Sequence, residues 1–229
     1  ASIFSANKDG YLTVAFLDVG QGDSIYIETP DGVQMLIDGG ADSSVLRALA
    51  KQMPILDRSL DVMLATHSDK DHIGGLIDVI KRYQIKTVVK TNNKNDTSVS
   101  EEFDRQVLSE NAEIVFAQSG QQYQLGASTT LLILSPEGNA ENWESNTASI
   151  VAQLQYGEIE FVLTGDAPIN IEDYISKSFG YLIESEVLKL GHHGSRTSTS
   201  DLFLDTIKPE YAIVSAGRDN SYGHPHKEV

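Results

Sequence analysis

The sequence contains no cysteine among its 229 residues, and this absence excludes several kinds of chemistry. Disulfides, thiolate metal sites and a cysteine nucleophile are all ruled out, so any bound metal must use nitrogen and oxygen ligands. Tryptophan is nearly absent as well, because the single one, Trp143, stands alone in the polar segment 141–145. We expect Trp143 either to pack in the protein interior or to form a lid or a base-stacking surface.

Long apolar runs and positive charges are also scarce. No apolar run approaches the ~20 residues that a membrane helix needs, and residues 1–10 are too polar for a signal peptide. Because the chain does not begin with Met, we expect it to belong to a longer one, with an upstream signal, membrane anchor or transport domain possible. Only 17 Lys and Arg oppose 33 Asp and Glu, which argues against broad coating of nucleic acid but permits phosphate chemistry at a small metal site.

The order of apolar runs and turn signals predicts an α/β fold. Strand-like runs at 11–16, 24–28 and 33–38 lead into a chain in which strands and helices alternate. Further strands are expected at 62–66, 85–90, 112–117, 131–134, 148–155, 159–163, 186–190 and 211–215, and helices at 43–52, from 76 onward, and at 99–109, 169–178 and 201–207. We therefore predict an αββα sandwich, two mixed β-sheets packed face to face with helices outside, as one domain over 1–229 whose last helix is cut off.

All six histidines lie in three short clusters beside Asp, Gly and Pro, and the lone carboxylate of Asp166 ends an apolar run between them. Imidazole and carboxylate are the usual ligands of borderline and hard divalent cations. The clusters therefore indicate a metal-dependent hydrolase. The predicted ligands are His67, Asp69, Asp71, His72, Asp166, His192 and His224, with the choice between His192 and His193 left open.

The spacing in this set suggests two cations. His67 and Asp69 could face one, Asp71 and His72 the other, and Asp166 could bridge both. Paired ions about 3.5–4 Å apart share a hydroxide nucleophile. Asp71 and His193 are the catalytic candidates, with His193 or His226 as a possible general acid.

Other residues near these clusters are candidates for contacts with substrate or for support of the ligands. Asp18 and Asp23 in a glycine-rich turn, and Asp38 before Gly39, could hold metal-bound histidines from behind. For Asp18 and Asp23, ordinary turn chemistry is an equal alternative. The candidates for substrate binding are Lys189, Ser195, Arg196 and Asn146.

Several of these motifs resemble a known family. The segment His67-Ser-Asp-Lys-Asp-His72 is similar to the His-x-His-x-Asp-His signature of the metallo-β-lactamase fold. Four further segments resemble the C-terminal hydrolase domain of the ComEC competence proteins and their free-standing relatives, from about Tyr11 to the end of the chain. They are Leu17-Asp-Val-Gly-Gln-Gly-Asp-Ser24, Ile37-Asp-Gly-Gly40, His192-His-Gly-Ser195 and Tyr222-Gly-His-Pro-His226.

The resemblance implies a metal-dependent phosphodiesterase or nuclease that acts on DNA. Its substrate would be a single strand that is degraded during DNA uptake. It also implies an extracellular or cell-surface location, with a cytoplasmic one left open. Asp69 replaces the second His of the signature, and no His lies between His72 and His192, so the first site is rich in oxygen. Oxygen ligands favour Mn²⁺, with Zn²⁺ or Mg²⁺ possible, and we expect manganese to support activity better than zinc. Two alternatives remain: a hydrolase of another ester (choline phosphodiester, lactone or β-lactam), and a non-catalytic metal-binding module.

Overall fold

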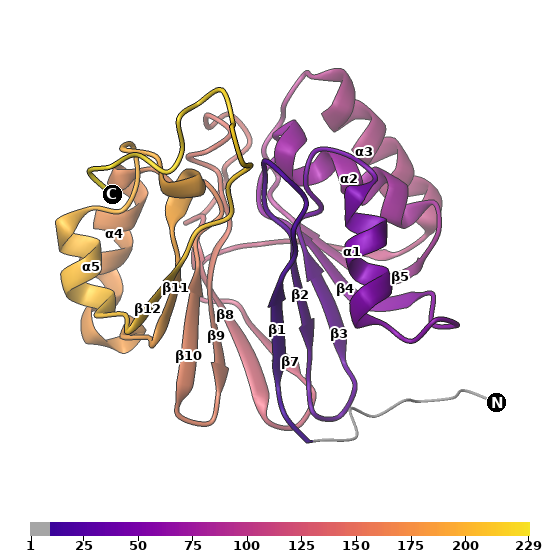
Figure 1. Ribbon diagram of the computed structural model, residues 1–229, viewed down its shortest axis with the longest axis horizontal. Helices are drawn as coiled ribbons and strands as arrows, with labels where there is room; N and C mark the ends of the chain where they lie inside the picture. Colours follow the sequence, from indigo (N-terminus) through magenta and orange to yellow (C-terminus); the bar gives the residue numbers. More distant parts are fainter. Residues whose placement is uncertain (1–9) are drawn as a thin grey trace.

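Two six-stranded β-sheets lie face to face, with helices on both outer surfaces (Figure 1). The computed structural model describes residues 10–229, so the expectation about a signal peptide concerns a segment that lies almost wholly outside that range. The arrangement is the predicted αββα sandwich, so the predicted fold class is confirmed.

The first sheet has the strand order β1-β2-β3-β4-β5-β6. Its first three strands pair antiparallel and β3 to β6 pair parallel. Helices α1, α2 and α3 cover its outer face (Figure 1). The bounds are β1 Thr13–Phe16, β2 Ile25–Glu28, β3 Gln34–Ile37, α1 Ser44–Gln52, β4 Ser59–Ala65, α2 Lys70–Ile80, β5 Gln84–Lys90, α3 Ser98–Glu110 and β6 Glu113–Phe116.

The second sheet has the order β12-β11-β10-β9-β8-β7, antiparallel from β7 to β10 and parallel from β10 to β12. Helices α4 and α5 cover its outer face (Figure 1). The bounds are β7 Gln122–Leu125, β8 Thr129–Ser135, β9 Val151–Tyr156, β10 Ile159–Leu163, α4 Ile169–Phe179, β11 Val187–Lys189, α5 Asp201–Ile207 and β12 Tyr211–Ile213, with short 3₁₀ helices at Gly180–Ile183 and Gly191–Gly194.

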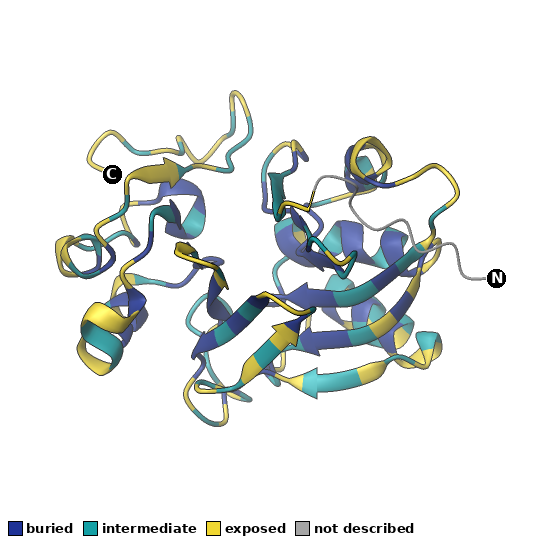
Figure 2. Ribbon diagram, turned by 90° about the horizontal axis from the view of Figure 1, so that it is seen from below, coloured by how far each residue is buried: buried dark blue, intermediate teal, exposed yellow. Residues whose placement is uncertain are grey.

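Alternation of side chains along the strands builds three apolar layers. In β2, Ile25 and Ile27 enter the layer between the sheets, whereas Tyr26 enters the layer under the first-sheet helices. This is the period-two pattern of a strand buried on both faces. A third layer lies under α4 and α5. Figure 2 shows that the helices are buried on the side that faces the sheets and exposed on the side that faces away from them.

The structure differs from the sequence-based expectations at a few places. Strand β7 was not predicted, because its Gln-Tyr-Gln-Leu sequence is mostly polar and lies at a sheet edge. Residues 148–150, predicted as strand, precede β9 in a turn. Trp143 packs against the layer under α4 and α5, so its interior-packing alternative describes it. Within residues 10–229, no helix is long and apolar enough to cross a membrane.

The parallel strands of both sheets end at the same edge of the molecule, the upper edge in Figure 1. Loops after the carboxyl ends of such strands are where α/β folds place ligands. Here they are the segments that follow β4, β10, β11 and β12, joined by the turn after β1. Every predicted metal ligand lies on one of these segments or in the first turn of α2.

Candidate metal centre

The first ligand cluster lies where β4 passes into α2. His67 lies in the connecting loop, Asp69 is the residue before the helix, and Asp71 and His72 belong to its first turn. Acidic side chains are favoured at this end of a helix, because the exposed backbone N–H groups carry partial positive charge. The local sequence therefore places four candidate ligands together through β4 and α2 alone.

A close approach of two backbone segments fixes His72 from behind. Helix α2 lies so near the segment after β3 that a Cβ on Gly75 would come within 2.0 Å of the Gly39 carbonyl oxygen. This contact places Asp38 under the His72 imidazole, with Oδ2 2.8 Å from Nδ1. The backbone N–H and hydroxyl of Thr66 both donate to the same carboxylate, at 2.8 and 2.7 Å. Asp38 thus lies where the sequence predicted a supporting carboxylate.

The second sheet contributes Asp166 after β10 and the His192-His193 pair after β11. Both histidines have left-handed backbone conformations, with φ of 49° and 58°. This unusual turn carries both rings to the same side, where both face Asp166. The Nε2 of His193 lies 3.5 Å from Asp166 Oδ2, and that of His192 lies 3.8 Å from it.

Asp166 Oδ2 is the centre on which the imidazoles converge. The Nε2 atoms of His72 and His67 lie 3.3 and 3.9 Å from it. Two outer carboxylates complete the ring: Asp69 Oδ2 is 3.8 Å from His67 Nε2, and Asp71 Oδ2 is 3.3 Å from His193 Nε2. One carboxylate oxygen therefore has four imidazole nitrogens around it.

Each of these four rings is held through its other nitrogen. Besides the bond of His72 to Asp38, the Nδ1 atoms of the remaining three contact Thr66 Oγ1 at 3.0 Å, Thr197 Oγ1 at 3.1 Å and the Ser215 carbonyl oxygen at 2.9 Å, for His67, His192 and His193 respectively. Anchoring of Nδ1 leaves Nε2 free to bind a metal, which is the usual arrangement of metal-binding histidines.

Buried polar atoms without partners test whether a cation fits. Among residues 10–229, no hydrogen-bond partner exists for the buried Nε2 atoms of His67, His72 and His193 or for Asp166 Oδ1. Such atoms are costly unless something binds them. A lone-pair nitrogen set around carboxylate oxygens fits a divalent cation, so these residues can hold one.

Asp23 belongs to the same buried cluster but lies on its far side. Asp23, His72, Asp166 and His193 offer ligand atoms within 4.8 Å of one another. Asp23, however, approaches the Nδ1 atoms of His193 and His72, at 3.4 and 3.9 Å, whereas Asp166 approaches their Nε2 atoms. A carboxylate on the Nδ1 side cannot share a cation held at Nε2, and so Asp23 lies in the supporting position that the sequence predicted.

The charges of the cluster are strongly coupled. Burial alone would raise the pKa of the Asp166 carboxyl, but attraction by His72 holds that pKa well below its usual range. Burial likewise opposes protonation of His193, yet the neighbouring carboxylates of Asp23 and Asp71 raise its pKa to about 9. For His67 the effect of burial prevails and lowers the pKa. The cluster therefore favours ionised carboxylates, which are the form that binds cations.

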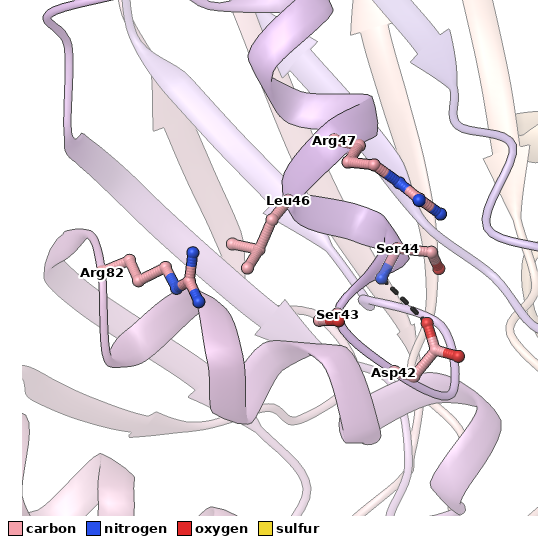
Figure 3. A pocket seen from close by; sticks show the side chains of 6 residues that line it. All are labelled: Asp42, Ser43, Ser44, Leu46, Arg47 and Arg82. Atoms are coloured by element: carbon pink, nitrogen blue, oxygen red, sulfur yellow. Dashed lines mark hydrogen bonds between the residues drawn. The ribbon is translucent and has the colours of Figure 1, made fainter.

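A cavity of about 130 Å³ opens over this cluster. Three aspartates, three histidines, a tyrosine and a glutamine line it. They are Asp69, Asp71, Asp166, His192, His193, His224, Tyr222 and Gln21. His224 lies half-buried on this wall, with its ring 5.5 Å from that of His192. A larger hollow of about 380 Å³ at the start of α1 is lined by residues that include exposed Arg47 and Arg82, and on its wall Ser44 N donates to Asp42 Oδ1 (Figure 3). No buried unpartnered group lines it among the described residues, so the smaller cavity is the candidate site.

The residues predicted to bind substrate do not line this cavity. Lys189 is wholly buried, forms an ion pair with Asp23 and donates to the Gly165 carbonyl oxygen at 3.2 Å, so its predicted contact with a substrate is wrong. Ser195 is also buried, and its hydroxyl is engaged by Thr197 at 2.9 Å. Arg196 is exposed and pairs with Glu228.

Three further residues lie apart from the cavity. Asn146 is half-buried in the loop before β9 and does not line it. Asp18 is exposed and accepts a hydrogen bond from Gly20 N, which is turn chemistry and not support of a histidine. His226 accepts from Arg196 N through Nδ1, and so it holds its own loop. In contrast, Gln21 and Tyr222 line the cavity and were not predicted, although both stand inside motifs that the sequence analysis quoted.

Comparison with known proteins agrees with this geometry. The profile of the metallo-beta-lactamase superfamily matches residues 17–218, and the chain belongs to this superfamily, whose members are generally hydrolases. The fold is similar to that of Igni18, a metallo hydrolase from Ignicoccus hospitalis, with a TM-score of 0.57, 15% identity and coverage of 88% of this chain and 80% of that one. It is also similar to CmlA, a diiron beta-hydroxylase from Streptomyces venezuelae, with a TM-score of 0.58, 14% identity and coverage of 93% and 48%.

Within the superfamily, the chain is similar to three competence-related proteins. It is 32% identical to ComE operon protein 3 of Bacillus subtilis over 94% of this chain, 31% identical to Recombination protein 2 of Haemophilus influenzae over 93%, and 30% identical to Competence protein ComA of Neisseria gonorrhoeae over 98%. The predicted resemblance is thus confirmed. The chain spans only 25–30% of the length of these relatives.

Proposed function

We propose that this chain is a metal-dependent phosphodiesterase that cleaves DNA, with single-stranded DNA as its substrate. The observation that carries the proposal is the convergence of four imidazole Nε2 atoms on Asp166 Oδ2 beneath an open cavity. Similarity to proteins named for competence and recombination supports DNA as the substrate. An extracellular or surface location belongs to the same proposal.

The ligands divide into two groups around Asp166. His67 and Asp69, together with His192, would hold one divalent cation, and the other would be held by Asp71, His72 and His193. When bound, such ions supply positive charge for phosphoryl oxygens and lower the pKa of water. The Nε2 of His193 cannot both bind a cation and deliver a proton, so we assign His193 to metal binding and not to acid catalysis.

The charge of the cavity wall makes cations necessary for binding as well as for chemistry. Asp69, Asp71 and Asp166 present carboxylates to the cavity, and burial there strengthens their repulsion of a phosphodiester. The chain as a whole also carries a formal charge of −16. We therefore expect the protein to bind DNA only in the presence of a divalent cation.

An exposed aromatic side chain favours a nucleic acid over a small ester. Tyr222 is 65% exposed on the wall of the cavity, and its ring stacks on that of His224 with centroids 5.7 Å apart and an angle of 22°. Stacking of a base on such a ring contributes about 1–3 kcal/mol. The bases of single-stranded DNA are unpaired, so they can stack there without breaking a base pair. The lactone and β-lactam rings themselves are not aromatic and offer no such stacking surface.

The test is degradation of a labelled single-stranded oligonucleotide with manganese, magnesium, zinc or a chelator. Hydrolysis of bis(p-nitrophenyl) phosphate and of nitrocefin should be measured in parallel, with Asp71→Ala as the inactive control. We expect cleavage of DNA and of the phosphodiester, faster with manganese than with zinc, and none of nitrocefin. Hydrolysis of nitrocefin alone, or metal binding without any turnover, would overturn the proposal.

A further inference from the structure

Gln21 has a side-chain amide whose orientation is fixed. Its Oε1 accepts a hydrogen bond from Gly217 N at 3.0 Å, which joins the turn after β1 to the loop after β12. Because that oxygen is engaged by a backbone donor, the NH₂ group must point the other way. Its Nε2 is buried and has no acceptor anywhere in the part of the chain that the structure describes.

The turn that carries Gln21 is pressed against the metal cluster. Gly22 has a φ of 119°, and a Cβ added to it would lie 2.0 Å from the Asp71 carbonyl oxygen, so only glycine permits this approach. Asp23 N also donates to that carbonyl, at 3.3 Å. Gln21 therefore lies on the cavity wall beside Asp71, Asp166 and His193, held at both ends by backbone contacts.

We propose that Gln21 Nε2 donates a hydrogen bond to a non-bridging phosphate oxygen of the substrate. A buried amide donor left without an acceptor is unfavourable, and a rigid one beside the reacting group is the kind of donor that stabilises developing negative charge. The carboxylates on the same wall repel a phosphate unless cations are bound to them. A neutral amide donor can bind the phosphate without competing for those cations. This inference rests on the proposed phosphodiesterase function and adds to it a residue that contacts the substrate.

Two variants separate donation from anchoring and from charge. Gln21→Glu keeps an oxygen for Gly217 N but removes the amide hydrogens and adds a negative charge. Gln21→Met removes both the donor and the acceptor at similar size and without charge. If the donor matters, both variants lose about tenfold or more in kcat for bis(p-nitrophenyl) phosphate. A loss confined to Gln21→Met would indicate anchoring only, and a loss confined to Gln21→Glu would indicate repulsion only; either result would overturn the inference.

Binding gives a readout that does not depend on turnover. With manganese present, we expect calorimetry to show inorganic phosphate binding several-fold more weakly to Gln21→Met than to the wild type, with manganese affinity unchanged. Equal phosphate affinity would refute the role of Gln21. A wild-type protein that hydrolyses no phosphodiester would instead refute the proposed function, so the two failures are distinguishable.

Discussion

The two halves of the molecule supply the candidate ligands in different ways. In the first half, which is the first sheet with its helices, all four candidate ligands come from the segment 67–72. This segment follows β4 and includes the first turn of α2. In the second half, Asp166, the His192-His193 pair and His224 come from three loops, after β10, β11 and β12. The first set is formed by local geometry, whereas the second exists only when three neighbouring strands are in register.

The support behind the rings differs in the same sense. His72 is held by Asp38, which belongs to the first half itself. His193 is approached by Asp23, which comes from the other half, and Asp23 is paired with Lys189 of β11. The first half is thus self-contained, whereas the second adds a charged contact with the first half to the bond between His193 Nδ1 and the Ser215 carbonyl oxygen. We therefore expect different effects from substituting Asp166, which faces imidazoles of both halves, Lys189, which joins the halves, and Asp38, which acts within one half.

Asp166 is the element that both halves share, so its loss should have the largest effect. Asp166→Asn keeps the shape but removes the charge that faces four imidazoles. We expect phosphodiesterase activity to fall by about 10³-fold or more, equivalent to about 4 kcal/mol. The matched control is Asp69→Asn, because the Asp69 side chain is 39% exposed and faces a single imidazole, that of His67. Equal losses in the two variants would show that Asp166 has no special position.

Lys189 should matter for stability because it joins the halves. Lys189→Met leaves the buried Asp23 carboxylate without its ion-pair partner, and breaking such a pair costs about 3–5 kcal/mol. Urea unfolding measures this loss. The double variant Asp23→Asn with Lys189→Met removes both charges, and we expect it to recover part of the stability, since a neutral pair leaves no uncompensated charge. Additive losses would mean that the two residues do not act as a pair.

The same contrast explains what the sequence could predict. The close grouping of His67, Asp69, Asp71 and His72 could be predicted, because their spacing along one strand end and one helical turn is a local property. Lys189 was assigned to substrate, because a lysine beside a histidine pair has the pattern of an anion contact; its burial arises only when Asp23 arrives from the other half. Asp18 and Asp23 share one turn, and no local signal distinguishes the exposed residue from the buried one.

Residues of the cavity wall show the same limit. Gln21 and Tyr222 lie in motifs that the sequence made visible, but their roles depend on contacts between the turn after β1 and the loop after β12. The fold class was predictable because alternation and turn signals act over a few residues at a time. Strand β7 was missed because a polar edge strand has little of that signal.

Glu172 anchors the segment that follows the His192-His193 pair, and the charge of its carboxyl group depends on pH. It is wholly buried in α4, and its carboxylate accepts from Thr199 N and Ser200 N at 2.8 and 2.9 Å. Burial raises its pKa to about 7, although the two backbone hydrogen bonds oppose this. Since the folded state then keeps a proton that the unfolded chain releases near its usual pKa of 4.5, the contribution of Glu172 to stability falls as pH rises from there to about 7.

Glu172→Gln isolates that contribution, because every other titrating group is common to both proteins. We expect the stability of the wild type relative to the variant to decrease by about 3 kcal/mol between about pH 4 and about pH 8. Denaturant unfolding across this range, with a chelator present, gives the difference. A difference that stays flat or increases with pH would contradict the burial of the charge.

Asp38→Asn should have the smallest effect, because it changes one local contact and leaves the cross-half pair intact. The asparagine can keep a hydrogen bond to Thr66, but it replaces the carboxylate at 2.8 Å from His72 Nδ1 with a neutral group. Loss of such a carboxylate behind a metal-binding histidine weakens metal affinity by about 10–100-fold. Manganese titration by calorimetry measures it, and Asp18→Ala, on the exposed turn, is the control that should bind as the wild type does. If Asp38→Asn bound manganese normally while Lys189→Met did not, the first half would not be the self-contained one.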